Sequence, residues 1–499
     1  MDNNDSPVSL AAIDLGSNSF HMIVVTLQDG QIQVLDRIKE SVRLASGLTD
    51  DHCLDAKIAE RAIECLQRFG QRVRDISPEN LRAVGTNTLR KADRCYGFMD
   101  QAQGALNHAI EVISGIEEAR LIHLGVAHSM PDDGGKRLVV DIGGGSTELI
   151  IGEGYDPILL ESLYMGCVNL SQEFFSDGSI TKSAMRKAMH SARMELLPIK
   201  RRYRDLGWNL AIGSSGTIRA IRDVVRQAGW SDNGITAESL KTLRNTMIEL
   251  GHTDALQLDG LSESRRTVFA GGVAVLSAVF DALDISRMLY STGALREGVI
   301  YDLVGRLHHH DMRETTVIAL ANRYQVDLRQ AQQVEDTALH LLKQVEDAWE
   351  LDSETATQWL HWASYLHEIG LVIAHSMYHK HGAYLIENSD LPGFSQRDQR
   401  LLSRLVLAHR RKLKQSILDE IPESVRSISL KLIILLRLAV ILNRDRSENA
   451  LPEIKATCEA DKLILNFPEE WLDNNMLTVT GLDAERKILK GHGFKLRYE

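Results

Sequence analysis

The sequence predicts an α/β protein in which two similar α/β domains precede an all-helical domain and a small C-terminal α/β unit. Three observations support this prediction. The first half of the chain alternates β-rich runs with helical patterns, which is typical of layered α/β folds. One arrangement of strands around a polar turn occurs twice in that half. The second half changes to long stretches of helical apolar periodicity.

The first domain is expected to begin with an antiparallel meander. Apolar runs at Leu10–Ile13 and Phe20–Val25 flank a polar turn, and a third strand, Gln31–Leu35, follows the turn Gln28-Asp29-Gly30. Short apolar runs bounded by turn residues are the usual signal of such strands. The polar turn after the first run therefore lies at the end of a strand.

The second domain repeats this arrangement. Arg137–Ile142 is typical of a strand, Gly143-Gly144-Gly145 of a turn, and Glu148–Ile151 of the returning strand. The two copies lie a full domain length apart, which resembles gene duplication rather than a short-period repeat. Two similar domains that face one another would form a cleft.

Helical periodicity dominates beyond Arg306. It covers Thr315–Trp349, Ala356–His375, Gln396–Lys412 and Ile428–Asn443. The alternating run Lys462–Phe467 then indicates a strand. We therefore expect four domains: 1–130 and 131–306 for the repeated pair, 307–446 for the helical domain and 447–499 for the C-terminal unit.

Composition restricts the class of protein and of partner. The chain is 44% hydrophobic and 25% charged, which suits a large soluble enzyme with several cores, and its net charge of −11 disfavours binding to nucleic acid polymers. The same charge would repel any anion at long range. A site for phosphate must therefore be local and use backbone amides, a few arginines and a metal.

The cysteines and the ends of the chain bear on localisation. Five cysteines with no CxxC spacing argue against a disulfide framework or a zinc cluster. The first seven residues lack the pattern of an export signal, and the apolar run Leu430–Leu442 is interrupted by charge and is shorter than the roughly 20 residues that span a bilayer. We expect a cytoplasmic protein without a transmembrane segment, with peripheral membrane association as an alternative.

The two polar turns are the candidate phosphate loops. A single turn of this kind is an ordinary hairpin about as often as it is a ligand loop. Two copies in matching strand contexts favour a function, because small residues let backbone N–H groups and hydroxyls close around phosphate oxygens. The predicted phosphate-binding residues of the loops are Gly16, Ser17, Asn18, Ser19, Gly143, Gly144, Gly145, Ser146 and Thr147.

Carboxylates at the ends of the repeated strands are candidate metal ligands. Asp14 and Asp141 end the first strand of each copy, and Glu148 follows two residues after Ser146. Strand alternation lets Ser146 and Glu148 point to one face. Oxygen ligands of this kind suit Mg²⁺, so we expect magnesium as the cofactor, with potassium as a candidate activator.

Two further segments carry candidate catalytic and binding residues. Ser114 can cap a helix whose first turn holds Glu117 and Glu118, and helix capping alone would explain them about half of the time. A carboxylate near a phosphate cleft can also deprotonate water. In the turn Gly85–Arg90, Thr88 and Arg90 are candidate phosphate contacts, although Arg90 alone would be a solvated charge. The small-residue turns at 213–217 and 292–298 rank lower.

Taken in order, the motifs DLGSNSFHM, GTNTLR, SGIEEARLI, DIGGGSTELIIG and GALREG are highly specific. The chain resembles the exopolyphosphatase and guanosine pentaphosphate phosphohydrolase family over essentially its whole length. The resemblance implies two actin-like (ribonuclease-H-like) domains with the active site between them. It also implies that Glu118 is the base that activates water, that Asp141 and Glu148 organise magnesium, and that the two loops hold phosphate.

The helical domain resembles the HD phosphohydrolase fold, whose metal site needs a His-Asp pair. The pair is His367-Glu368 here, so a structural or polymer-binding role is favoured over a second metal site. The histidines near this pair are His361, His375, His379, His381 and His409. A basic run could guide a polyanion or be a solvated face: Arg404, Arg410, Arg411, Lys412 and Lys414. His308-His309-His310 falls at the domain junction.

Within the family, the chain is closer to exopolyphosphatase, on the segments Phe280–Leu283, Gly293–Gly298 and Ala408–Lys412. We therefore expect Mg-assisted hydrolysis of terminal phosphate from inorganic polyphosphate, preferred over the alternative activity by a narrow margin. The alternative is 5′-phosphohydrolysis of guanosine pentaphosphate. A rival from another class is an actin-like kinase or ATPase, and a non-enzymatic reading is a polyphosphate-sensing scaffold. Apolar helical faces in the C-terminal half make a homodimer the expected assembly.

Overall fold

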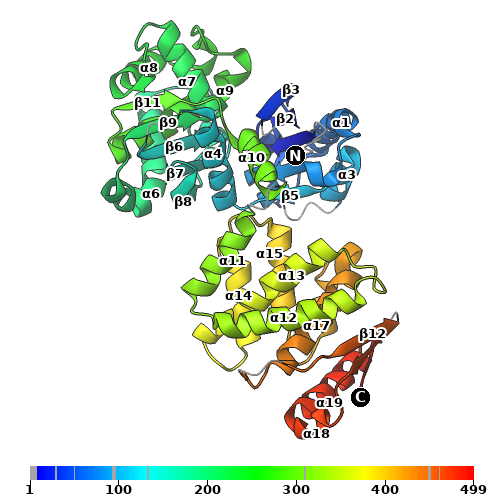
Figure 1. Ribbon diagram of the computed structural model, residues 1–499. Helices are drawn as coiled ribbons and strands as arrows, with labels where there is room; N and C mark the ends of the chain where they lie inside the picture. The colour runs from blue at the N-terminus through cyan, green and yellow to red at the C-terminus, as the bar shows by residue number, and fades with distance from the viewer. Residues whose placement is uncertain are drawn as a thin grey trace. The chain divides into compact units, whose positions relative to one another are not determined.

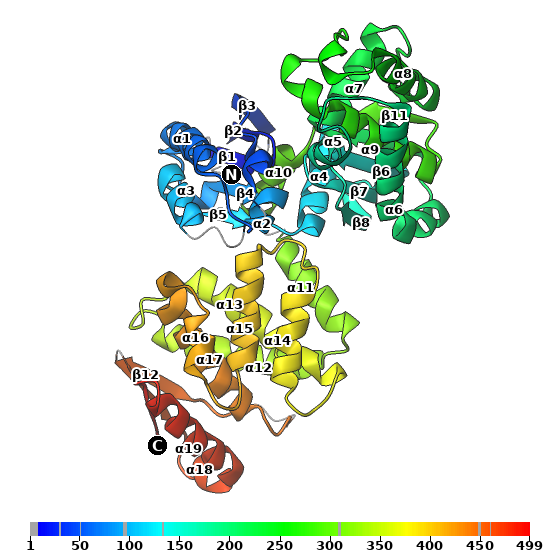
Figure 2. The ribbon, with the colours of Figure 1, turned by 180° about the vertical axis from the view of Figure 1, so that it is seen from behind.

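The computed structural model describes residues 8–28, 31–49, 51–92, 97–131, 134–307, 311–447, 451–459 and 461–499. The turn residues Asp29 and Gly30, Cys95 and the run His308–His310 lie outside the described residues. The chain divides into two compact units, Met1–His310 and Asp311–Glu499 (Figures 1 and 2). The finer division into four domains stays a prediction.

The first sheet of unit Met1–His310 contains the expected meander. Strands β1 and β2 pair antiparallel, as do β2 and β3, and β4 adds to β1 in parallel. The order across the sheet is β3-β2-β1-β4-β5. The strand bounds are β1 Val8–Leu15, β2 Phe20–Gln28, β3 Gln31–Glu40, β4 Leu81–Gly85 and β5 Ile110–Val112.

The second sheet repeats the first. Its order is β10-β11-β9-β6-β7-β8, so that β8-β7-β6-β9-β11 matches β3-β2-β1-β4-β5 strand for strand. The pairs β6/β7 and β7/β8 are antiparallel, and β6/β9 is parallel. The internal repeat is therefore real. The bounds are β6 Lys136–Ile142, β7 Thr147–Glu153, β8 Asp156–Leu163, β9 Leu210–Ser214, β10 Ile235–Thr236 and β11 Arg287–Tyr290.

Two helices, α4 and α10, fill the space between the sheets (Figure 1). One apolar core contains residues of both helices together with residues of β1, β4, β6 and β9. The helices approach closely because Gly298 of α10 lies against α4, where a Cβ would meet the Leu121 carbonyl oxygen at 1.7 Å. Residues of α1 and α3 share an apolar core with the first sheet, and residues of α5, α6, α7, α8 and α9 share one with the second sheet. Helix bounds are α1 Ala56–Val73, α2 Asn87–Lys91, α3 Phe98–Leu106, α4 Gly115–Ser129, α5 Cys167–Phe174, α6 Lys182–Leu206, α7 Ser215–Gln227, α8 Ala237–Leu250, α9 Arg266–Leu283 and α10 Leu295–Leu307.

A buried ion network ties the same region together. Arg82 of β4 donates from Nη1 to Asp302 Oδ2 of α10 at 2.6 Å, and Arg120 of α4 also pairs with Asp302. Arg120 Nε donates to Glu117 Oε2 at 2.7 Å. Because each buried charge has partners of opposite charge, the attraction within the network offsets the cost of removing these groups from water. It fixes α4, and with it the position of Glu118.

Unit Asp311–Glu499 is mainly helical and ends in a small sheet. The helices and the sheet share one hydrophobic core, and the order of the strands is β12-β13-β14. The bounds are α11 Met312–Arg323, α12 Leu328–Val345, α13 Ser353–Leu366, α14 Tyr378–Asn388, α15 Gln396–Ala408, α16 Gln415–Asp419, α17 Glu423–Leu442, β12 Lys455–Glu459, β13 Lys462–Asn466, α18 Trp471–Asn474, α19 Met476–Lys490 and β14 Lys495–Tyr498.

One long helical prediction in this unit is divided in the structure. The stretch Thr315–Trp349 forms α11 and α12, with a break where Gln325 adopts a left-handed φ of 54°. The side chain of Asp327 then caps α12 by accepting from the Gln330 backbone N–H at 3.1 Å. Apolar periodicity continues across the break because both helices face one core, so the pattern alone did not reveal it.

One helical segment, Glu263–Leu283, is long and apolar enough to span a membrane by length and composition. However, 78% of its apolar window is buried inside the protein. This is the behaviour of a core helix, and the segment includes α9, whose residues belong to the core of the second sheet. Cys65, Cys167 and Cys458 are free cysteines.

Candidate active site

The first candidate phosphate loop is the hairpin between β1 and β2. Asp14 pairs with His21 and Leu15 with Phe20, so residues 16–19 form the connection. Ser17 and Ser19 are buried polar residues. The Thr88 hydroxyl donates to Ser17 Oγ at 2.8 Å. Because that oxygen is already an acceptor, the Ser17 hydroxyl proton is available to a ligand.

The second candidate phosphate loop is the equivalent hairpin between β6 and β7. Asp141 pairs with Glu148 and Ile142 with Thr147. The loop is closed by the Gly143 N–H, which donates to the Ser146 carbonyl at 2.9 Å. The start of α5 is hydrogen-bonded to this loop, because the Cys167 and Val168 N–H groups donate to the carbonyls of Gly143 and Gly144.

The two loops meet. A Cβ built on Gly144 would lie 3.0 Å from Ser17 Cβ, so glycine permits this approach. Both loops line one cavity of about 160 Å³. Of the predicted site residues, the structure brings ten together around it: Asp14, Gly16, Ser17, Asn18, Ser19, Glu118, Asp141, Gly143, Gly144 and Ser146.

Three carboxylates of this cavity lie in a strongly desolvating environment. Burial, followed by the charge of Glu118, raises the pKa of Asp14 from 3.8 to about 8. Burial also raises the pKa of Asp141 to about 7, although a hydrogen bond from Ser214 acts in the opposite direction. Asp14 Oδ1 is buried without a hydrogen-bond partner among the described residues. A cation bound here would relieve both desolvation and mutual repulsion.

Glu118 and its neighbour Glu117 have different surroundings. The Ser114 side chain caps α4 by accepting from the Glu117 N–H at 3.1 Å, as expected. Glu117 points into the buried ion network, whereas Glu118 lines the cavity. Arg90 Nη1 donates to Glu118 Oε2 at 2.8 Å and to the Ile113 carbonyl at 2.9 Å. Burial raises the pKa of Glu118 and Arg90 lowers it.

Five predicted site residues are not among the described residues that line this cavity. Thr88 and Arg90 act on Ser17 and Glu118 as described above, and Gly145 packs against Asn87. Thr147 is fully buried, and its hydroxyl donates to the Met165 carbonyl. Glu148 is 1% exposed, and its Oε1 accepts from the Ser162 hydroxyl at 2.8 Å. Burial and the charges of Glu118 and Asp141 raise the pKa of Glu148.

The structure adds two arginines that the sequence motifs did not identify as site residues. Arg265, just before α9, and Arg296 of α10 line the cavity. Burial lowers the pKa of Arg265, so an anion beside it would stabilise the charged form of its guanidinium group. Arg296 Nη1 lies 3.2 Å from His21 Nδ1. The turns at 213–217 and 292–298 also reach the cavity, through Ser215, Gly216, Thr217 and Ala294.

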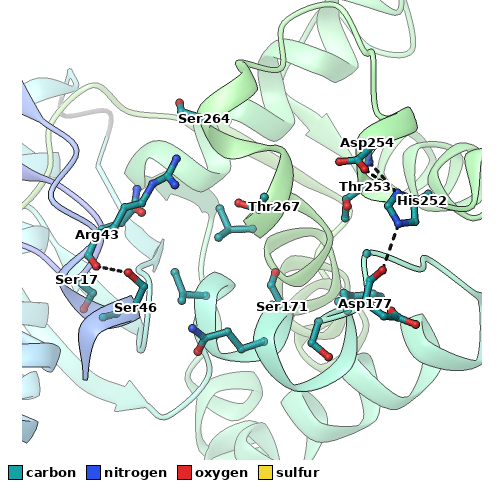
Figure 3. A pocket seen from close by; sticks show the side chains of 18 residues that line it. Ser17, Arg43, Ser46, Ser171, Asp177, His252, Thr253, Asp254, Ser264 and Thr267 are labelled. Carbon is teal, nitrogen blue, oxygen red and sulfur yellow. Dashed lines mark hydrogen bonds and ion pairs between the residues drawn. The ribbon is translucent and has the colours of Figure 1, made fainter. Parts of the chain in front are cut away.

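A larger cavity of about 530 Å³ adjoins the loops and shares Ser17 and Asn18 with the first (Figure 3). Ser17 and Arg43 lie on one wall, and Asp177 and His252 lie on the other. His252 contacts the Asp177 carbonyl at 3.2 Å. Apolar side chains complete the lining, among them Val168, Phe175 and Val268. The mixture of apolar, acidic and basic groups suits an organic anion better than a uniform polyanion.

Magnesium fits the donor set of the smaller cavity when it retains water. No group of three or more His, Cys, Asp or Glu side chains within the described ranges is spaced to hold a metal ion directly. Mg²⁺ usually keeps several waters and uses one or two carboxylates. The unpartnered Asp14 Oδ1 and the raised pKa values of Asp14 and Asp141 are consistent with such a cation.

Two family models match almost all of the chain. The model of the Ppx/GppA phosphatase family matches residues 23–307. The model of Ppx/GppA phosphatase domain III matches residues 312–486. Together they cover both compact units.

Curated relatives match over nearly the full length. A guanosine-5′-triphosphate,3′-diphosphate pyrophosphatase of Aeromonas hydrophila is 40% identical over 494 residues, which are 99% of each chain. A protein of the same name from Vibrio vulnificus is 41% identical over 98% of each chain.

Solved structures share the fold of part of the chain. An exopolyphosphatase from Cytophaga hutchinsonii has a TM-score of 0.55 and 23% identity, covering 60% of this chain and 98% of its own. The Aquifex aeolicus PPX-GPPA enzyme has a TM-score of 0.51 and 24% identity, covering 59% and 99%. At this level of identity the likeness concerns the fold alone.

Proposed function

The chain belongs to the Ppx/GppA phosphatase family and is a hydrolase, and from this premise we propose that it removes the terminal 5′ phosphate of guanosine pentaphosphate. The observation that carries the proposal is 40% identity over 99% of both chains to a relative named for that nucleotide. This reverses the order of preference expected from the motifs, which placed inorganic polyphosphate first. Membership of a phosphatase family also sets aside the kinase and the non-enzymatic scaffold.

The larger cavity supports a nucleotide over a polymer. Asp177 and Asp254 line it, and their carboxylates would repel a chain of phosphates. The same groups can accept hydrogen bonds from the N–H groups of a guanine base, which Phe175 and Val268 can contact. Arg43 lies across the cavity and can pair with an anionic group of the nucleotide.

The proposed reaction is in-line attack of water on the terminal phosphorus. Glu118 takes the proton of the water, and the bond from phosphorus to the bridging oxygen breaks. Its raised pKa makes it a stronger base than an exposed glutamate, and Arg90 holds one of its oxygens. Ser17 and the loop amides donate to the phosphate oxygens, and Arg265 and Arg296 supply positive charge.

Asp14 and Asp141 are the residues that would hold magnesium through its waters. The ion would neutralise charge that develops on the phosphoryl oxygens. Glu148 pairs across the sheet with Asp141 and accepts from Ser162, so it would support the site from behind. Thr88 and Arg90 are positioning residues for Ser17 and Glu118.

Phosphate release measured side by side on guanosine pentaphosphate and long polyphosphate, with magnesium, tests the proposed preference. We expect kcat/KM to be higher for the nucleotide. The double substitution Asp177→Asn/Asp254→Asn should narrow the difference, because it removes charge that opposes the polymer. Higher kcat/KM for polyphosphate in the unmodified protein would contradict this preference and would support the second candidate function, exopolyphosphatase.

A further inference from the structure

A separate cavity of about 590 Å³ lies in unit Asp311–Glu499 among the end of α13, the turn after α15, and α17 with the segment that follows it. We call it the histidine cavity, because His367 and His409 line it. The two rings lie nearly perpendicular to one another, with centroids 5.5 Å apart.

Each of these histidines has one ring nitrogen without a hydrogen-bond partner among the described residues, and that of His367 lies 4.0 Å from Glu368 Oε1. Each is 1% exposed. The Nδ1 atom of His367 lies 2.6 Å from the Ser364 carbonyl, and that of His409 lies 2.6 Å from the Val406 carbonyl. A carbonyl accepts only, so each Nδ1 carries the proton and each Nε2 offers a lone pair. Neither Nε2 has a hydrogen-bond partner among the described residues.

The rest of the lining is strongly cationic. Two arginines are neutralised, since Arg437 pairs with Glu485 at 2.6 Å and Arg446 with Glu368 at 2.7 Å. Four further cations line the cavity without an ion pair to any described carboxylate: Arg410, Arg411, Lys412 and Arg444. The site therefore carries positive charge within a protein of net charge −11.

This combination selects for a particular ligand. Two imidazole lone pairs alone could bind a metal ion, but unpaired cations around them oppose it, and a third metal-binding side chain is missing among the described residues. An anion that only accepts hydrogen bonds would leave both Nε2 atoms unpaired, which is costly in a buried site. The ligand must be anionic and must also donate a hydrogen bond.

We propose that the histidine cavity binds hydrogen orthophosphate, whose O–H donates to an Nε2 of the histidine pair while its other oxygens accept from the unpaired arginines. Hydrogen orthophosphate is an anion with a proton to donate. Sulfate has the same shape and no such proton at neutral pH. Burial lowers the pKa of both histidines, so they remain acceptors rather than donors.

Isothermal titration calorimetry on the full-length protein at neutral pH tests the proposal, with orthophosphate and sulfate as the probes. We expect one class of orthophosphate sites to weaken about 10-fold or more in Arg410→Gln and in His409→Asn. Asparagine keeps a donor to the Val406 carbonyl and removes Nε2. Arg400→Gln, on an exposed part of α15 outside the cavity, is the matched control and should bind as the unmodified protein does.

The substitution Ser17→Ala distinguishes this binding from phosphate binding at the candidate active site. It should leave orthophosphate binding in the histidine cavity unchanged. Arg410→Gln should leave phosphate release from substrate unchanged and should fold, because Arg410 is only partly buried. Sulfate should bind at least about 10-fold more weakly than orthophosphate. Equal binding of sulfate, or orthophosphate binding that is unchanged by Arg410→Gln, would overturn the proposal.

Discussion

Adjacent glutamates at the start of α4 illustrate how one residue position decides between structure and chemistry. Glu117 is fully buried and pairs with Arg120, whereas Glu118 lines the cavity and pairs with Arg90. A turn of about 100° along the helix separates the two side chains. One therefore belongs to the ion network between the sheets and the other to the candidate active site.

Replacing Glu118 by Gln should reduce kcat about 1000-fold, because the variant keeps a partner for Arg90 and loses the proton acceptor. Substrate binding, measured by calorimetry, should persist. Glu117→Gln is the matched control, and we expect it to lower the free energy of unfolding by about 3 kcal/mol through the buried ion network. Turnover of Glu118→Gln near that of the unmodified protein would refute the assignment of the base.

The two aspartates should make magnesium binding dependent on pH. Their pKa values in the folded protein, about 8 for Asp14 and about 7 for Asp141, lie above the ordinary value of 3.8. The folded state then holds protons that the unfolded chain has lost, so the contribution of these groups to stability falls as pH rises across this interval. Magnesium needs the ionised forms.

We therefore expect the rise in Tm caused by magnesium to grow between about pH 6 and pH 8. Differential scanning fluorimetry with and without magnesium measures it, and Asp141→Asn should flatten the dependence. A rise in Tm that is independent of pH would argue against these aspartates as the groups that hold the metal.

Among the elements, the loop hairpins were predictable and the arginines were not. Strand alternation and the small residues of Gly16–Ser19 and Gly143–Ser146 indicate the hairpins locally. Arg265 lies just before α9 and Arg296 in the first turn of α10, both far along the chain from the two loops, and both line the cavity. The GALREG motif contains Arg296 but did not identify it as a site residue, and no local pattern indicated Arg265.

The predicted orientation of Glu148 and Thr147 shows the same limit. Alternation along β7 could place Glu148 on the same face as Ser146, but tertiary packing decides which side chains reach the cavity. The Thr147 hydroxyl donates to the Met165 carbonyl, and Glu148 Oε1 accepts from the Ser162 hydroxyl. The family resemblance followed from the motifs in their order, whereas the choice of substrate within the family did not.

The contact between α4 and α10 is an element-level constraint with a direct test. Gly298→Ala places a methyl group against the Leu121 carbonyl, which belongs to the helix backbone and cannot move aside cheaply. We expect a loss of about 3 kcal/mol in the free energy of unfolding, measured by urea denaturation. Gly104→Ala in α3 is the matched control, because nothing lies within 4 Å of its added Cβ. A gain of up to about 1 kcal/mol is expected there.

If Gly298→Ala were as stable as the unmodified protein, this result would contradict the close approach of α4 and α10 at Gly298. The contact bears on the candidate active site because α4 carries Glu118.

At the scale of the whole molecule, the two similar sheets of unit Met1–His310 contribute to a single site for the proposed hydrolysis. Each copy contributes one loop and one aspartate to the cavity, and α4 contributes Glu118, the proposed base. The second unit has its own core and its own cationic cavity. We therefore propose bond cleavage in unit Met1–His310 and orthophosphate binding in unit Asp311–Glu499.

Hydrolysis of guanosine pentaphosphate in ¹⁸O-labelled water, followed by mass spectrometry of both products, tests whether water attacks the terminal phosphorus. We expect one labelled oxygen in the released orthophosphate and none in the remaining guanosine tetraphosphate, with the reaction lost in Glu118→Gln. Label in the nucleotide product, or release of pyrophosphate in place of orthophosphate, would contradict the proposed reaction.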